Sequence, residues 1–152
     1  LQKDDVIAFR APKTDLKNLG VRHTSPEFVP RAEYKLRVVL GPQDDAFTEL
    51  GITTFLSSVY TLTPEFDRMG CGIAFGAIQV PSAGKPIIML ADRQTTGGYT
   101  KIANVISADF RILAQLKTGD RVRFEKVSIV DAQEALLAQR ATLRCLRSAM
   151  NR

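Results

Sequence analysis

Residues 91–103, ADRQTTGGYTKIA, form the densest group of side chains in the chain that could bind a ligand. The apolar run at residues 87–90 leads into them, and an acid, a base, an amide and two hydroxyls then follow without a spacer. An arginine offers a fork for a carboxylate, carbamate or phosphate, while amides and hydroxyls both donate and accept hydrogen bonds. The motif is therefore suited to a planar polar group, such as an amide, a ureido group or a carboxyl group.

Gly97 and Gly98 would let the backbone adopt positive φ here and approach a ligand closely. The alternative is a β-bulge and turn whose polar groups satisfy one another, since TTGG is not a P-loop and GxGxxG is absent. Asp67 and Arg68 form a second polar group, for which a local ion pair is the alternative to a ligand site. The residue types alone leave both alternatives open.

Several kinds of catalytic centre are not expected from the remaining residues. His23 is the single histidine and lies in a loop-like stretch, and Cys71 and Cys145 are far apart without a CxxC pair. We therefore expect no metal site and no Ser/His/Asp set. The thiols should be free, in a reducing cytoplasm. If the chain belongs to an enzyme, hydrogen-bond placement and a partner or cofactor should supply the catalytic power.

Length and composition predict one globular domain over residues 1–152, because 45% of the residues are hydrophobic and 24% are charged. No apolar run is long enough to cross a membrane, and LQKDDVIAFR does not read as a signal peptide. We expect no membrane partner. Since the first residue is not Met, the sequence also predicts a fragment of a longer chain.

Positive charge gathers near the C-terminal end, where Arg140, Arg144, Arg147 and Arg152 lie. One interpretation is an anionic partner. The other is a helix C-terminus, where the dipole favours cations. No RNA-binding aromatic signature or zinc-finger spacing is present, so nucleic acid is not expected as a partner.

Alternating apolar residues predict strands at residues 35–40, 99–106 and 121–128, and the turn SAGK predicts a hairpin between residues 73–81 and 85–91. Strands in succession with little helix between them argue against a parallel βαβ sheet. The pattern favours a small closed barrel or a compact sandwich with two or three short helices.

Residues that can cap a helix N-terminus predict where the helices begin. Asp44 or Asp45 is expected to cap a helix that reaches residue 58, with Gly51 as a weak point or an end. Ser107 is expected to cap a short helical turn, with Asp109 in its first turn.

The C-terminal helix should begin with an acidic capping box formed by Asp131 and Glu134. Its apolar stripe has helical spacing and is expected to pack on the core. The stripe consists of Leu136, Leu143, Leu146 and Met150.

Two long segments carry a resemblance: RVVLGPQDDAFTELGITTFLSSVYTLTPEFDRMG, and GIAFGAIQVPSAGKPIIMLADRQTTGGYTKIANVISADFRILAQLKTGDRVRFEKVS. They resemble the biotin-dependent carboxyltransferase family over residues 1–127. That family includes the C-type subunit of the prokaryotic 5-oxoprolinase and one half of the carboxyltransferase domain of urea carboxylase. Some members are labelled allophanate hydrolase subunit two or the antagonist of a sporulation-kinase inhibitor. The resemblance implies a cyclophilin-like closed β-barrel that forms the C-terminal part of a longer subunit.

The resemblance also implies a role in ATP-dependent cleavage of 5-oxoproline to glutamate, or in transfer of a carboxyl group from carboxybiotin to urea. No cofactor would be bound by this chain itself, while the complex would use ATP, with biotin as a second candidate. The partners would be the other 5-oxoprolinase subunits, the B-type subunit most directly, and a small amide substrate. The alternative is a regulatory protein that sequesters an inhibitor of a histidine kinase. The isolated domain should be inactive.

Site residues carried over from the family motifs fall into two groups. The catalytic candidates are Asp67, Arg68 and Gln94. The substrate-binding candidates are Gln79, Asp92, Arg93, Thr95, Thr96, Gly97, Gly98 and Tyr99. Hydrogen bonds to substrate would come from the amide and the threonines, and an anion clamp from Arg93 or Arg68, with Asp67 as an orienting group or base.

The junction between Cys71 and Gly72 is short, because members of the family have a polar stretch after the RMG motif. We predict that residues are missing at this point. The two Cα atoms would then lie well beyond the roughly 3.8 Å of a trans peptide.

Overall fold

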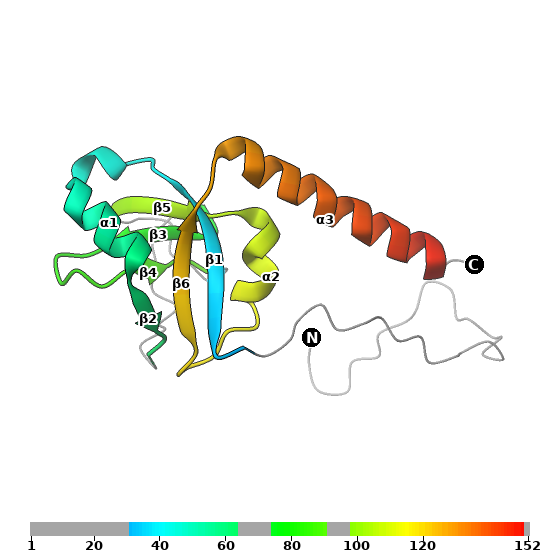
Figure 1. The fold of residues 1–152 in the computed structure, drawn as a ribbon, viewed down its shortest axis with the longest axis horizontal. Coiled ribbons are helices and arrows are strands. Elements are labelled where there is room, and N and C mark those ends of the chain that lie inside the picture. The colour runs from blue at the N-terminus through cyan, green and yellow to red at the C-terminus, as the bar shows by residue number, and fades with distance from the viewer. Residues whose placement is uncertain (1–30, 64–73, 91–97, 151–152) are drawn as a thin grey trace, which may run out of the picture.

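The computed structural model of the chain describes residues 31–63, 74–90 and 98–150, without the side chain of Met150 (Figure 1). The elements follow one another as β1 (Glu33–Leu40), the 3₁₀ turn η1 (Asp44–Ala46), α1 (Glu49–Ser57), β2 (Val59–Thr61), β3 (Ala77–Val80), β4 (Ile87–Ile88), β5 (Thr100–Val105), the 3₁₀ turn η2 (Ser107–Asp109), α2 (Phe110–Leu113), β6 (Arg121–Lys126) and α3 (Ile129–Met150).

The strands form one curled sheet of six in the order β2-β6-β1-β5-β3-β4. Neighbours are antiparallel except β1 and β6, which are parallel. Within the described ranges no pairing joins the edge strands β2 and β4, so this part of the chain forms a half-barrel (Figure 1). The predicted mainly-β architecture, with short helices and a C-terminal helix, is confirmed.

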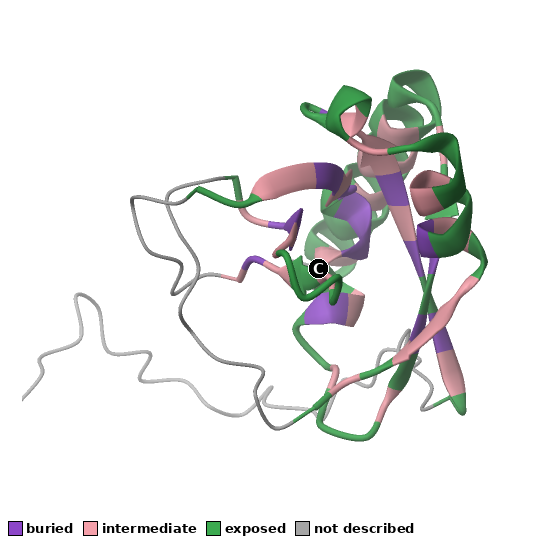
Figure 2. Ribbon diagram, turned by 90° about the vertical axis from the view of Figure 1, so that its left-hand side faces the viewer, coloured by how far each residue is buried: buried purple, intermediate pink, exposed green. Residues whose placement is uncertain are grey.

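The core lies on the concave side of the β1–β6 pair. Leu36 and Val38 of β1 are buried, as are Val122 and Phe124 of β6, because alternate side chains of a strand point to the same face. α1 covers this face through Phe55, whose ring stacks on Phe124 with centroids 4.6 Å apart. Figure 2 shows the buried residues concentrated on the strands and on the short helical segments.

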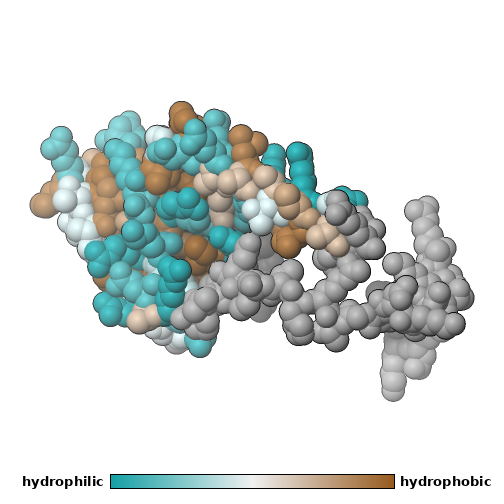
Figure 3. All heavy atoms as spheres, turned by 45° about the vertical axis from the view of Figure 1, so that its right-hand side comes forward, coloured by the Kyte–Doolittle hydropathy of each residue, from teal (hydrophilic) through white to brown (hydrophobic). Residues whose placement is uncertain are grey.

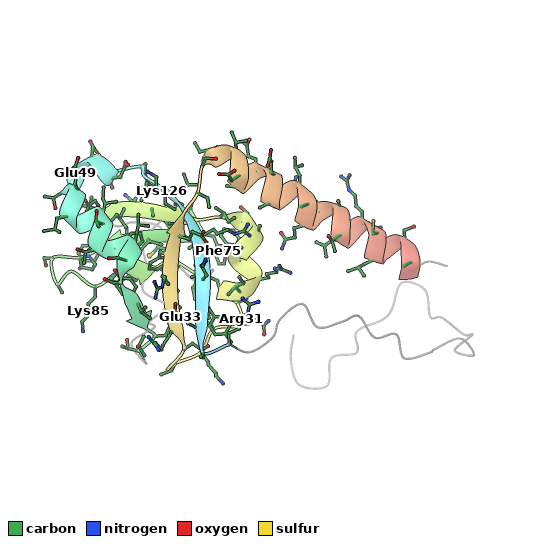
Figure 4. All side chains as sticks on the ribbon, in the orientation of Figure 1. Arg31, Glu33, Glu49, Phe75, Lys85 and Lys126 are labelled. Carbon is green, nitrogen blue, oxygen red and sulfur yellow. The ribbon has the colours of Figure 1, made fainter. Side chains whose placement is uncertain are left out.

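The outer face of the same strand pair carries ion pairs between neighbouring side chains. Arg123 Nε lies 3.0 Å from Glu33 Oε1, and Lys35 Nζ lies 3.2 Å from Glu125 Oε2. Figure 4 shows Glu33 at the start of β1, next to Arg31. Exposed ion pairs of this kind contribute little stability. The charges of Glu33, Lys35, Arg123 and Glu125 therefore belong to a solvated face.

The predicted hairpin is confirmed, since β3 and β4 pair antiparallel, with Ile78 opposite Ile88. Its turn needs Gly84, which has φ +76° and donates its N–H to the carbonyl of Pro81 at 2.8 Å. The predicted strand at residues 99–106 corresponds to β5, in which Ile102 and Val105 are buried.

α1 begins at a different residue from the one predicted. Its N-cap is Thr48, whose Oγ1 accepts a hydrogen bond from the N–H of Gly51 at 3.1 Å. Asp44 and Asp45 lie in η1 instead, and the prediction of an aspartate cap is wrong. The reason is local: the chain becomes extended at Phe47, with φ −111° and ψ 145°, and this interrupts the helix.

The predicted Ser107 cap is also wrong. η2 follows Ile106 and has no side-chain cap. Asp109 is only 2% exposed and accepts hydrogen bonds from the backbone N–H of Arg37 at 2.8 Å and from its Nε at 3.1 Å. These charge-assisted bonds are stronger than an interaction with a helix dipole. They tie η2 to β1, and the hydrogen bonding of the Arg37 guanidinium to the Asp109 carboxylate raises the pKa of Arg37.

α3 begins at Ile129, two residues before the predicted cap Asp131. Ser128 Oγ accepts a hydrogen bond from the N–H of Asp131 at 3.1 Å, and the Asp131 carboxylate accepts from the N–H of Ser128 at 3.1 Å. The acidic capping box is therefore formed by Ser128 and Asp131, in place of Asp131 and Glu134. The hydrogen bonds from Ser128 lower the pKa of Asp131.

The predicted packing of the α3 stripe on the core is wrong for most of its length. Leu136 and Leu146 are half-buried, and Leu143 is 59% exposed. No described side chain of α3 is buried. The reason is visible in Figure 1, where α3 touches the domain only near its first half and then runs away from the sheet.

Candidate functional site

The structure describes three of the predicted site residues: Gln79, Gly98 and Tyr99. The others lie outside the described residues: Asp67, Arg68, Asp92, Arg93, Gln94, Thr95, Thr96 and Gly97. The junction of Cys71 and Gly72 also lies outside them. The described part of the site is therefore the strand framework on either side of the motif.

β3 separates the two ends of the motif. On one side, the carbonyl of Met89 accepts a hydrogen bond from the N–H of Gly76 at 2.8 Å. The residues directly before the motif therefore lie beside the start of β3. On the other side, Thr100 pairs with Val80 at the end of β3. The motif therefore connects the two opposite ends of one four-residue strand.

Gln79 fastens the second of these ends. Its side chain is 2% exposed, and its Nε2 donates a hydrogen bond to the carbonyl of Tyr99 at 3.3 Å. The sheet is irregular at this point, since the pairing of β3 with β5 shifts register between Ile78 and Gln79. A buried amide therefore holds the backbone of the motif at Tyr99, next to the point where the register of the ladder shifts.

Tyr99 and Gly98 lie on the surface. Tyr99 is 53% exposed, so its ring is available to contact a ligand or a partner chain. Gly98 does not have positive φ, and a Cβ built on it would meet no atom within 4 Å. Gly98 therefore does not use the positive φ that a glycine allows, and the open space beside it leaves its backbone accessible.

Two polar residues that were not among the predicted candidates, Gln43 and Asn104, hold β5 near both of its ends. Gln43 Oε1 accepts hydrogen bonds from the backbone N–H of Lys101 at 3.2 Å and from its Nζ at 3.3 Å. Asn104 Nδ2 donates to the carbonyl of Gly41 at 2.9 Å. These bonds join β5 to the turn after β1. No short-range pattern predicts them, because the partners of Asn104 and Lys101 are some 60 residues earlier in the chain.

Neither a metal centre nor a membrane-spanning helix is found in the described ranges. No group of three or more His, Cys, Asp or Glu side chains is placed to hold a metal ion there. None of the described helices has the length and apolar character that a bilayer crossing requires. What the described part of the site offers is a rigid strand framework, an exposed aromatic ring and hydrogen-bonding groups.

The fold is that of a carboxyltransferase-type domain. The structure resembles the urea amidolyase of K. lactis with a TM-score of 0.61 and 21% identity, over 71% of this chain and 8% of that one. It also resembles TTHA0988 with a TM-score of 0.56 and 27% identity, over 69% of this chain and 24% of that one.

Residues 1–126 match the family model described as carboxyltransferase domain, subdomain A and B. The chain therefore belongs to this family, as the two quoted segments predicted. Two curated relatives are named as the C-type subunit of 5-oxoprolinase. The protein of Haemophilus influenzae is 47% identical over 78 residues, and that of Escherichia coli is 32% identical over 119 residues. The matches include 51% and 66% of this chain, and they span 25% and 38% of the relatives' own lengths.

Proposed function

We propose that this chain is part of a subunit of an ATP-dependent 5-oxoprolinase, which converts 5-oxoproline to glutamate. A variant of this proposal is a related biotin-dependent carboxyltransferase that acts on an amide or urea. The observation that carries the proposal is that both curated relatives are named as the C-type subunit of 5-oxoprolinase. The chain spans well under half of each relative. We therefore assign the 5-oxoprolinase activity to the whole proposed complex and not to this chain alone.

The role of this chain within the complex would be to bind the substrate. 5-Oxoproline presents a cyclic amide and a carboxylate, and both are planar polar groups. Gln94, Thr95 and Thr96 would hydrogen-bond the amide, and Arg93 or Arg68 would hold the carboxylate. Asp67 would orient these groups or accept a proton. Asp92 and Gly97 belong to the same motif and would shape the backbone around the ligand.

The described residues support this role through the hydrogen bond from Gln79 to the carbonyl of Tyr99. Substrate-positioning groups must be held within a fraction of an ångström to be effective. The buried amide of Gln79, which holds the backbone of the motif at Tyr99, contributes to such rigidity. Gln79 thus acts as a positioning residue, with Tyr99 as the group exposed to the ligand.

No cofactor is assigned to this chain, and we propose that other subunits bind the ATP, with biotin entering only in the carboxyltransferase variant. Since the reaction consumes ATP, we also propose a cytoplasmic location. Any activity requires the partner subunits, the B-type subunit most directly.

The test is co-expression of the full-length subunit with the subunits encoded beside its gene, followed by assay of ATP-dependent glutamate release from 5-oxoproline. Gln94→Ala should reduce release at least about a hundredfold, as expected for a lost transition-state contact. Gln133→Ala is the matched control, because Gln133 is exposed on α3 and is not part of the motif. Glutamate release by the domain alone, or none by the complete complex, would contradict the proposal. Binding of a kinase inhibitor without turnover would favour the regulatory alternative.

A further inference from the structure

α3 carries an apolar repeat that is longer than the surface on which it packs. Its members recur at alternating intervals of three and four residues, which is the heptad spacing of helices that pack against another helix. The repeat consists of Ile129, Ala132, Leu136, Leu143, Leu146 and Met150, with the polar Gln139 at the one remaining position. We call this series the α3 seam.

Only the first half of the seam meets the domain. Ala132, Leu136 and Gln139 are half-buried, and Gln139 Nε2 donates a hydrogen bond to the carbonyl of Ala108 in η2 at 3.3 Å. η2 is in turn tied to β1 through Asp109 and Arg37. The first half of α3 therefore has a fixed platform.

We call the second half of α3, residues 140–150, the α3 arm. Among the described elements, none provides a comparable platform for it. At a rise of 1.5 Å per residue it extends about 16 Å beyond Gln139. Leu146 is its one half-buried side chain among residues 140–149, and Leu143 is 59% exposed. Figure 3 shows hydrophobic atoms with hydrophilic side chains beside them on the side of the molecule where α3 leaves the domain.

The charge of the arm is of one sign. It contains Arg140, Arg144 and Arg147 and no acidic residue. Within the described ranges, the salt bridges involve β1, β6 and η2 and none of these three arginines. Like charges three and four residues apart on a helix repel one another, although the dipole at the helix C-terminus offsets part of this. An occupant of the seam would gain by carrying acidic groups.

A second copy of the chain would not place acidic groups beside the arginines of the arm. In an antiparallel helix pair, Arg140 and Arg147 would face the same residues of the other copy. In a parallel pair they would face the neutral positions Ala135, Thr142 and Ala149. A lipid surface is also a poorer fit, because the apolar stripe is the narrow seam of a coiled coil and α3 contains no aromatic residue.

The arm also lies beyond the domain that the family shares, since the family match ends at residue 126 and α3 begins at Ile129. We propose that the α3 arm docks onto another subunit of the complex, against an apolar helix or groove bordered by Asp and Glu side chains. This inference rests on the proposed function for the existence of that subunit.

The experiment measures the affinity of the full-length subunit for the companion subunits encoded beside its gene. Leu143→Ser should weaken binding at least about tenfold, as for a buried contact residue. Leu137→Ser is the matched control, because Leu137 is 63% exposed on the same helix but lies off the seam. It should change the affinity less than about twofold, and both variants should keep the helical circular dichroism of the parent.

The triple variant Arg140→Glu, Arg144→Glu, Arg147→Glu tests the charge. The parent complex should weaken as salt rises from about 0.05 to 0.5 M, because screening shortens the range of charge attraction. The triple variant should bind at least about tenfold more weakly at low salt and lose this dependence. Equal binding by all variants would overturn the inference.

Three other outcomes would also overturn it. They are a Leu143-dependent dimer of the chain alone, arm-dependent binding to vesicles of equal phosphatidylcholine and phosphatidylserine, and equal loss for Leu143→Ser and Leu137→Ser. If the complex forms and releases glutamate while the arm variants bind normally, only this inference fails. If no complex forms, the proposed function fails with it.

Discussion

α1 and α3 begin alike and end in opposite environments. Each starts with a hydroxyl cap, Thr48 for α1 and Ser128 for α3. α1 then buries Phe55 to 3% exposure against the ring of Phe124, whereas no described side chain of α3 is buried. A cap therefore sets where a helix begins, while an apolar stripe does not say which surface will cover it.

The sharpest test of this contrast compares the two apolar side chains. Phe55→Ala should lower the free energy of unfolding by about 3–5 kcal/mol, because it leaves a cavity beside Phe124. Leu143→Ala should change it by less than about 0.5 kcal/mol, as for an exposed position. Urea unfolding of the two variants measures both values. Similar losses would show that the α3 arm packs within its own domain.

The second-largest loss of stability is expected at η2, the segment on which the first half of α3 packs. Asp109→Ala should cost about 1–3 kcal/mol, because it leaves the N–H donors of Arg37 without their buried acceptor. Glu125→Ala is the control, since it removes only the exposed pair with Lys35 and should cost less than about 1 kcal/mol. Thermal unfolding compares them. An equally small change at both positions would contradict a structural role for Asp109.

The caps should give smaller effects with different readouts. Thr48→Ala and Ser128→Ala each remove a capping bond worth about 1 kcal/mol. For Thr48 the loss should appear as a lower unfolding midpoint, because α1 is part of the core. For Ser128 it should appear as faster amide exchange in the first turn of α3, with the midpoint nearly unchanged. The same midpoint shift in both variants would erase the distinction between the two helices.

The smallest effect is a pH dependence confined to α3. The pKa of Asp131 is lowered by its hydrogen bonds with Ser128, so the charged carboxylate is favoured in the folded state. Its contribution is complete above the ordinary carboxyl pKa of about 4 and is lost as pH falls through the lowered folded value. Amide exchange in the first turn should therefore increase in acid. Asp131→Asn should abolish this dependence, and an unchanged pH response in that variant would rule out Asp131 as its source.

Local structure in this chain could be predicted from the order of its residues. The alternation in residues 121–126 placed Val122 and Phe124 inward, and the turn at Gly84 defined the β3–β4 hairpin. The long motifs identified the family. These features are readable because each depends on residues that are neighbours along the chain or on the composition of a single segment.

The described part of the candidate site was predicted only as a set of residues. Gln79 and Tyr99 were both named, but their hydrogen bond joins residues 20 positions apart, on strands whose register shifts between Ile78 and Gln79. Glycine at position 98 allows positive φ, but only the structure shows that this conformation is not used there.

The partners of Asp109 and the surroundings of α3 became clear only from the arrangement of the chain in space. Asp109 reads as a helix-start acid until β1, 72 residues earlier, brings Arg37 beside it. The α3 seam reads as core until α3 is seen to run away from the sheet (Figure 1), after Gln139 has bonded to Ala108 of η2. A side chain's chemistry is local, but burial and pairing depend on which distant surface comes opposite, and no periodicity in one segment encodes that surface.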